Sequence, residues 1–227
     1  MIARSPRLSA AGCRGLYAIA DTGIVDASAM PAAIQAALLG GAALLQYRCK
    51  DPREAVPLPQ LRNIATMCRH AGVPFIVNDD PELAATIGAD GVHVGIDDPD
   101  PGVVRRHLGE HAIVGVSCYD SLERAAAAAA EGADYIAFGR FYPSPTKPDA
   151  VPADPAILRT AKQQFTLPVA AIGGITPDNA ATLIHAGADL IAAVSGVFAT
   201  PDPQAAAAAY QRLFQTVRGF AAPSNLP

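Results

Sequence analysis

The sequence predicts a single (β/α)8 TIM barrel, an α/β fold in which eight parallel strands close into a cylinder surrounded by helices. Two observations carry this prediction: a strict alternation of eight strand-like and eight helix-like segments, and a short glycine-led motif that recurs four times. The 227 residues are 51% hydrophobic and 17% charged, which suits one domain of this size with a substantial core.

Short β-rich segments alternate along the chain with alanine- and leucine-rich segments of helical periodicity. The predicted strands are 15–20, 43–48, 74–79, 91–95, 112–118, 135–139, 168–174 and 190–196. The predicted helices are 29–39, 54–70, 81–87, 101–108, 121–131, 154–165, 177–186 and 203–217. Because a helix follows every strand, we expect parallel strands joined by right-handed crossovers.

The internal repeat supports a closed sheet. The stretches "GGAALLQ", "GADGVHV", "GADYIAFG" and "GADLIAAV" place a glycine at 41, 88, 132 and 187, where a helix should end and a left-handed residue can turn the chain into the next strand. These positions precede strands two, four, six and eight. Eight units on a four-fold pattern favour a barrel over the open, doubly wound sheet that is the structural alternative.

Bulk properties exclude several classes of function. A net charge of −4 offers no general basic surface for nucleic acid, and no apolar run reaches the length of about 18 residues that a membrane span needs. The four cysteines show neither a C-x-x-C nor a zinc spacing, which indicates reduced thiols in a cytoplasmic protein. We expect a flexible leader over 1–14, the catalytic barrel over 15–218 and a flexible tail over 219–227.

The stretch "ALLQYRCK" ends an apolar strand with three long polar side chains on one face, since alternate residues of a strand point the same way. Gln46, Arg48 and Lys50 share that face, and Tyr47 and Cys49 point to the other. Two cations at the end of a buried strand are costly unless an anion meets them. The active site of this fold lies at the carboxyl ends of the strands, so the pattern predicts an anion site there.

Carboxylates follow the next two strands. Asp80 precedes a proline and is expected to cap the following helix, which leaves Asp79 without a structural task. Of Asp97 and Asp98, one is expected to cap the helix near residue 101, and the other could complete a metal site with Asp79. Magnesium typically takes one or two protein carboxylates and leaves its other positions to water and phosphate oxygens, but each acid taken alone also has a structural interpretation.

Later segments add groups suited to phosphate. The proline-rich loop after strand six carries Ser144, Thr146 and Lys147, and its length is typical of a lid or binding loop, although a solvated surface loop is an equal alternative. "AIGGIT" and "AVSG" follow strands seven and eight, where barrels often bind phosphate. We interpret His93 as a hydrogen-bonded, neutral imidazole inside the barrel and Ser117 as a hydrogen-bonding residue rather than a nucleophile.

Taken together, these motifs resemble the thiamine phosphate synthase family. From "LYAIAD" to "AVSGVF", the segments "QYRCK", "IVNDD", "GVHVGIDD", "GVS", "PSPTK", "AIGGI" and "AVSG" match that family's motifs in order. The resemblance implies a Mg²⁺-dependent transferase of thiamine biosynthesis, which joins an aminopyrimidine carrying a diphosphate to a thiazole phosphate or its carboxylate. It implies a dissociative reaction: diphosphate leaves, the aminopyrimidine stabilises the methylene cation, and the thiazole nitrogen captures it. Such chemistry needs charge neutralisation and positioning rather than a nucleophile.

The resemblance also implies a role for each matched residue. Asp79 and Asp98 would bind magnesium, and Arg48, Lys50 and Lys147 would be catalytic as stabilisers of the departing diphosphate. The residues implied for the pyrimidine diphosphate are Gln46, Arg48, Lys50, Asn78, Ser117 and Lys147. Those implied for the thiazole phosphate are Ser144, Thr146, Gly174, Val194 and Ser195. Tyr47, Cys49, Pro145 and Gly173 belong to the same motifs and complete the substrate-binding candidates.

The chain departs from the family pattern at four positions: Ile96 replaces a frequent Gln, Cys49 an acid or Asn, Ser144 a Thr, and Tyr119 a His. None removes a metal carboxylate or a cation. The alternatives are a metal-independent thiazole tautomerase, a sugar-phosphate isomerase or epimerase, and a non-catalytic binder of thiazole phosphate. The expected partners are the two small substrates, with no nucleic acid and no membrane, and association into a homo-oligomer stays open.

Overall fold

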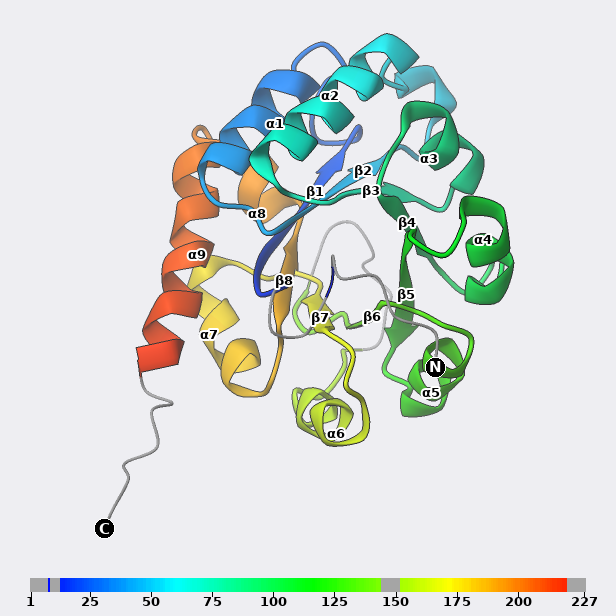
Figure 1. Ribbon diagram of the computed structural model, residues 1–227. Helices are drawn as coiled ribbons and strands as arrows, with labels where there is room; N and C mark the ends of the chain where they lie inside the picture. The colour runs from blue at the N-terminus through cyan, green and yellow to red at the C-terminus, as the bar shows by residue number, and fades with distance from the viewer. Residues whose placement is uncertain (1–7, 9–12, 144–151, 220–227) are drawn as a thin grey trace.

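A computed structural model describes residues 8, 13–143 and 152–219, and its eight strands form one closed parallel barrel in the order β1 to β8 (Figure 1). Each strand pairs with its neighbours in sequence, and β8 closes the cylinder against β1. The predicted TIM barrel is therefore confirmed, and the open sheet is excluded. The strands are β1 Gly15–Asp21, β2 Leu44–Arg48, β3 Phe75–Asn78, β4 Gly91–Val94, β5 Ile113–Tyr119, β6 Tyr135–Phe138, β7 Val169–Ile172 and β8 Leu190–Ala193.

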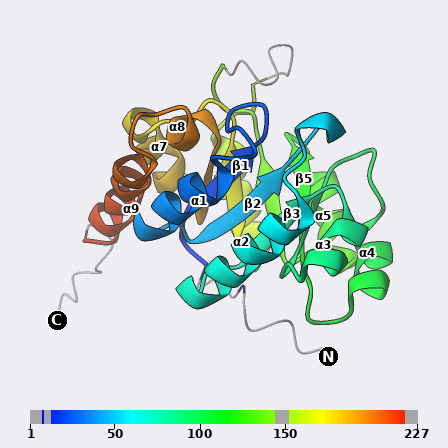
Figure 2. The same cartoon turned by 90° about the horizontal axis from the view of Figure 1, so that it is seen from above.

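The helices surround the barrel: α7, α8 and α9 gather on one side, and α3, α4 and α5 on the opposite side (Figures 1 and 2). The helices are α1 Met30–Leu39, α2 Leu58–Ala71, α3 Pro81–Ile87, α4 Pro101–Leu108, α5 Leu122–Ala130, α6 Ala156–Gln164, α7 Pro177–His185, α8 Ser195–Phe198 and α9 Pro203–Gly219, with a 3-10 turn η2 at Pro52–Glu54. Within the described residues, none of these helices is both long and apolar enough to cross a membrane.

The predicted elements are confirmed, and only two boundaries move by more than two residues. The helix expected from residue 54 begins at Leu58, because Pro57 has an extended backbone and the preceding residues form the separate turn η2. The strand expected to reach residue 196 ends at Ala193, because Ser195 already begins the short helix α8.

The repeat glycines have the backbone that their position predicts. Gly41, Gly88, Gly132 and Gly187 all have a positive φ, between 69° and 113°. L-residues rarely adopt this conformation, so glycine is required where each helix turns into the next strand.

An aspartate in the same repeat ties neighbouring strands together. In β5, the backbone N–H of Val114 donates to Asp134 Oδ2 at 2.8 Å, and Arg105 of α4 donates to the same oxygen at 2.6 Å. The Asp189 carboxylate makes the equivalent contacts with the Val169 N–H at 3.0 Å and with a lysine of α6 at 2.7 Å. The "GAD" motif is therefore a structural clamp at the amino ends of the strands.

The core has two layers. One fills the space between strands and helices, and the other fills the floor of the barrel, where Tyr17, Leu44, Ile76 and Tyr135 are almost fully buried. Leu8 and Cys13, from the segment expected to be a leader, are buried in this inner cluster. Because side chains close the amino end of the barrel, the carboxyl ends of the strands form the end that can admit a ligand.

Candidate active site

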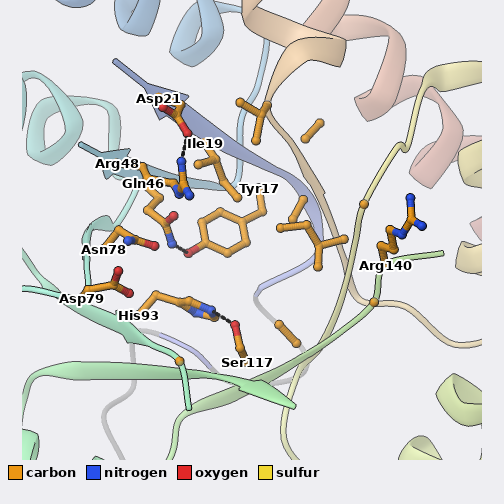
Figure 3. Close-up of a pocket in the computed structure, with 18 of the residues that line it drawn as sticks. Tyr17, Ile19, Asp21, Gln46, Arg48, Asn78, Asp79, His93, Ser117 and Arg140 are labelled. Atoms are coloured by element: carbon orange, nitrogen blue, oxygen red, sulfur yellow. Dashed lines mark hydrogen bonds and ion pairs between the residues drawn. The ribbon is translucent and has the colours of Figure 1, made fainter. Parts of the chain in front are cut away.

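A cavity of about 310 Å³ lies at the carboxyl ends of the strands, and all eight strands contribute to its wall. Figure 3 shows the side chains of β1, β2, β3, β4 and β5 converging on it. The volume is typical of a site for a small molecule. Of the residues predicted from sequence, those that line it are Gln46, Arg48, Lys50, Asn78, Asp79, Asp98, Ser117, Gly173, Gly174, Val194 and Ser195.

Two cations stand on one side of the cavity, each beside a carboxylate. Arg48 donates to Asp21, the partner of its position in the β1–β2 register, and Asp21 also accepts from the Gly23 N–H at 2.9 Å. Lys50 donates to Asp79. The Arg48 side chain is 19% exposed and that of Lys50 58%, so Arg48 is held in place while Lys50 reaches toward solvent. The anion-binding face expected from "ALLQYRCK" thus opens into the cavity.

Asp79 and Asp98 form a pair of carboxylates beside Lys50. Burial would raise the pKa of Asp79, but hydrogen bonds from Lys50 and with Asp98 lower this pKa below its ordinary value. Burial raises the pKa of Asp98, and the hydrogen bond and negative charge of Asp79 raise it further, against the opposing N–H of Gly95 at 2.6 Å. The negative charge of Asp79 disfavours ionisation of Asp98, so the oxygens of this pair suit a hard divalent ion.

The backbone and the capping acids refine this picture. Asp79 has φ 63°, a left-handed conformation that is rare outside glycine. Asp80 caps α3 by accepting from the Leu83 N–H, as predicted. The prediction that Asp97 or Asp98 caps α4 is wrong, because Asp100 occupies the N-cap position and Asp98 turns toward Asp79 instead. No cluster of three or more His, Cys, Asp or Glu side chains suited to a metal occurs within the described ranges.

The opposite side of the cavity is built from backbone. Gly173 and Gly174 follow β7 with φ 103° and 62°, and a Cβ on Gly174 would lie 2.3 Å from the Pro143 carbonyl oxygen. Only glycine fits this close approach, and bare backbone N–H groups are well suited to a phosphate. Val194 and Ser195, at the start of α8, complete this wall.

Some predicted residues lie elsewhere. Tyr47 is buried on the outer face of β2, where its hydroxyl accepts from the Val56 N–H at 3.1 Å, and Cys49 points the same way and contacts the Asp51 carbonyl at 3.1 Å. Neither lines the cavity. Ser144, Pro145, Thr146 and Lys147 fall outside the described residues.

A chain of polar side chains crosses the barrel beneath the cavity. Gln46 Nε2 lies 2.5 Å from the Tyr17 hydroxyl, which lies 2.7 Å from the Tyr135 hydroxyl. Tyr135 lies 2.9 Å from His93 Nδ1, and His93 Nε2 lies 2.9 Å from Ser117 Oγ. The interior, hydrogen-bonded position expected for His93 and the hydrogen-bonding role of Ser117 in this chain agree with the sequence analysis.

Four residues that line the cavity were not predicted as site residues from the sequence: Asp21, Tyr17, Tyr119 and Arg140. Asp21 offered a signal, because it is an acid that ends an apolar strand in the same manner as Asp79. Tyr119 has φ 56°, and its ring lies 5.8 Å from the guanidinium carbon of Arg124. The orientation of Tyr17 toward the barrel axis became evident only with the strand register.

The comparisons with known proteins each find the same family. A family model described as thiamine monophosphate synthase matches residues 16–197. Thiamine-phosphate synthases of Marinobacter nauticus and Aromatoleum aromaticum are 51% and 52% identical to this chain over 202 and 201 residues, which cover 88% of it and 90% and 96% of those relatives. A solved thiamine phosphate pyrophosphorylase from Pyrococcus furiosus has a TM-score of 0.79 at 30% identity, covering 91% of this chain and 98% of that one.

Proposed function

The chain belongs to the thiamine monophosphate synthase family, and we propose that its barrel mouth joins an aminopyrimidinylmethyl diphosphate to a thiazole phosphate, giving thiamine phosphate and pyrophosphate. It is thus a transferase of thiamine biosynthesis on a TIM barrel. The observation that carries the assignment of the site is the convergence of Arg48, Lys50 and the Asp79–Asp98 pair at one side of a single cavity.

The cationic side suits the diphosphate. Arg48 and Lys50 supply positive charge, and Asn78, Gln46 and Ser117 line the adjacent wall with amide and hydroxyl groups. The ion pair with Asp21 holds Arg48 in place before substrate arrives, so less conformational entropy is lost on binding, whereas Lys50 pairs with Asp79 at a more exposed position. Lys147, outside the described residues, is proposed as a third cation for the same group.

The carboxylate pair suits magnesium. Asp79 and Asp98 are hard oxygen ligands. Burial raises the pKa of Asp98 and the neighbouring Asp79 raises it further, as expected for two like charges that a divalent cation would stabilise. When bound there, Mg²⁺ would neutralise the diphosphate oxygens and make diphosphate a better leaving group. Lys50 lies against the same pair and is positioned to share that charge.

The glycine-rich wall suits the second substrate. Gly173, Gly174, Val194 and Ser195 present backbone to the cavity, and we propose that they hold the phosphate of the thiazole, with Ser144 and Thr146 from the loop outside the described residues. The two phosphate-binding walls face each other across one cavity. This separation brings the two rings together while keeping their charged groups apart.

In this reaction the protein positions the two substrates and stabilises charge, and no protein nucleophile is needed. Departure of the diphosphate leaves a methylene cation stabilised by the aminopyrimidine, and the thiazole nitrogen captures it. Arg48 and Lys50 oppose the negative charge that develops on the leaving group, and the largely apolar wall of Ile19, Ile172 and Ala192 limits access of water to the cation.

The direct test incubates the protein with both substrates and Mg²⁺ and measures thiamine phosphate and pyrophosphate together. We expect equimolar products and loss of turnover when the metal is chelated. Absence of both products from a protein that still binds thiazole phosphate would favour the non-catalytic binder instead. The tautomerase and sugar-phosphate alternatives give the Asp79–Asp98 pair no function.

We further propose a cytoplasmic location, in keeping with four free cysteines.

A further inference from the structure

Four members of the polar chain beneath the cavity, Gln46, Tyr17, His93 and Ser117, reach the cavity wall, and one member, Tyr135, does not. Gln46 and Ser117 line the cavity on β2 and β5 (Figure 3). Tyr135 of β6 is 0% exposed and does not contribute to the cavity wall. Its hydroxyl nevertheless lies 2.7 Å from Tyr17 and 2.9 Å from His93 Nδ1, so it connects the two halves of the chain.

The direction of the hydrogen bonds follows from counting donors. In the amide orientation that the structure has, Gln46 donates from Nε2, so the Tyr17 oxygen accepts and its own proton must go to Tyr135. The Tyr135 proton then goes to His93 Nδ1, which must be unprotonated. A neutral His93 consequently carries its proton on Nε2 and donates it to Ser117 Oγ at 2.9 Å.

The reverse direction leaves a donor unsatisfied. If His93 carried its proton on Nδ1, Tyr135 would accept from it and donate to Tyr17, which would then accept twice. The Tyr17 proton would have no acceptor, since the hydroxyl contacts that the structure describes are those with Gln46 and Tyr135. A buried, unsatisfied donor disfavours that arrangement by about tenfold or more in population.

We propose that Tyr17 and Tyr135 are positioning residues that fix His93 as its Nε2–H tautomer and thereby keep the Ser117 hydroxyl as a hydrogen-bond donor toward the cavity. Ser117 Oγ accepts from His93, and no acceptor for its own proton occurs among the side chains that the structure describes, so this proton faces the ligand space. The identity of the acceptor, a diphosphate oxygen, rests on the proposed function. Gln46, at the other end, keeps Oε1 as an acceptor.

The first experiment needs no turnover. Imidazole ¹⁵N spectra of the folded wild-type protein should show His93 with a protonated Nε2 and an unprotonated Nδ1. Tyr135→Phe removes the donor to Nδ1 and should convert His93 to a mixture of tautomers. Tyr210→Phe is the matched control, because it also removes one buried hydroxyl, whose bond goes to the Ile175 carbonyl at 2.8 Å outside the chain. A wild-type His93 protonated on Nδ1 overturns the proposal.

The second experiment is a double-mutant cycle on steady-state kinetics. Tyr135→Phe should lower kcat/KM for the pyrimidine diphosphate by about tenfold, the size expected for one hydrogen bond to a charged group, and leave the KM of the thiazole phosphate unchanged. In a Ser117→Ala background the same change should have little further effect, because Tyr135 acts through Ser117. Additive losses, or equal losses for both substrates, would indicate a merely structural role.

The two readouts separate this proposal from the proposed function. If His93 has the expected tautomer but the protein makes no thiamine phosphate, the proposed hydrogen-bond chain stands and the proposed substrates are wrong. If Tyr135→Phe does not fold, Tyr17→Phe interrupts the chain one link earlier and is tested in the same cycle. Urea unfolding of each variant shows whether a kinetic loss comes from lost stability.

Discussion

At the scale of single residues, the site depends on charges that the protein pairs before any ligand binds. Arg48 donates to Asp21 and Lys50 to Asp79, so each cation has a carboxylate partner at the cavity wall, and the less exposed Arg48 is the more firmly held. Asp79 and Tyr119 add left-handed backbone at the ends of β3 and β5. Strained conformations persist only where the surroundings enforce them, and here both lie at the cavity.

Asp79→Asn tests the metal assignment with a residue that tolerates the left-handed backbone better than alanine does. The amide cannot supply an anionic ligand, so we expect magnesium-dependent turnover to fall by a hundredfold or more, on the order of 3 kcal/mol of lost stabilisation, with unfolding little changed. The control Asp120→Asn changes an exposed acid just beyond β5 that does not line the cavity. Unchanged rates in Asp79→Asn would refute the metal role.

Asp21→Asn tests whether the partner of Arg48 matters to binding. Without the carboxylate the guanidinium loses its fixed position, and we expect the KM for the pyrimidine diphosphate to rise by about tenfold, roughly the worth of one charge-assisted hydrogen bond. Asp26→Asn, an exposed acid a few residues later, is the matched control. Tighter binding in Asp21→Asn would instead mean that Asp21 competes with the substrate for Arg48.

At the scale of elements, the repeat divides its work between two residues. The glycine allows each helix to turn into the next strand, and the aspartate that follows holds the start of an adjacent strand. One backbone N–H of each of the strands β3, β5 and β7 donates to such an aspartate, and the accepting carboxylates are those of Asp90, Asp134 and Asp189 respectively. In the first copy of the motif, alanine stands at position 43 in place of the aspartate.

Asp134→Asn should show the value of one such clamp. The change leaves Arg105 without its ion partner in a site where the carboxylate is almost fully buried, and breaking buried pairs is costly. Because Arg105 is 22% exposed, we discount for solvent and expect a loss of about 2 kcal/mol in urea unfolding, with kcat/KM retained. Glu131→Gln, an exposed neighbour in the same loop, should change stability by less than about 0.5 kcal/mol. Equal stability of both variants would show that the clamp is not stabilising.

At the scale of the whole molecule, burial keeps several thiol and tyrosine side chains protonated at alkaline pH values where they would ionise in an unfolded chain. Burial raises the pKa of Cys13, Cys68, Cys118 and Tyr47 to about 12 in each case. The folded state therefore holds protons that the unfolded state releases above its ordinary pKa values, near pH 9 for thiols and pH 10 for tyrosines. Their contribution to stability is complete below pH 9 and is lost as the pH rises toward 12.

The urea midpoint should accordingly fall steadily when unfolding is measured at pH 8, 9.5 and 10.5. Cys68→Ala removes one of the contributing thiols and should make the decrease shallower, while lowering the midpoint at pH 8 only through lost packing. A midpoint that is constant or rising over this range would show that these groups ionise as readily in the folded protein.

The sequence by itself determined the fold and many of the side chains that line the cavity. Periodicity and the recurring glycine predicted all eight strands, and the rule that barrel sites lie at carboxyl ends brought Gln46, Arg48, Asn78, Asp79 and Ser195 to one cavity. These features can be predicted because they are local: the hydrophobic period and the turn residues depend on residues that are close together in the sequence.

Only the tertiary structure decided which side chains pair across strands. Asp21 meets Arg48 because their strands run in register, Asp98 turns to Asp79 rather than capping α4, and Tyr17, Tyr135 and His93 meet on the barrel axis. Tyr47 and Cys49, which belong to the motif "QYRCK", face away from the cavity. Contacts of this kind depend on register and closure, which join residues from 27 positions apart, as for Asp21 and Arg48, to 118 positions apart, as for Tyr17 and Tyr135, and leave no signal in any short stretch of the sequence.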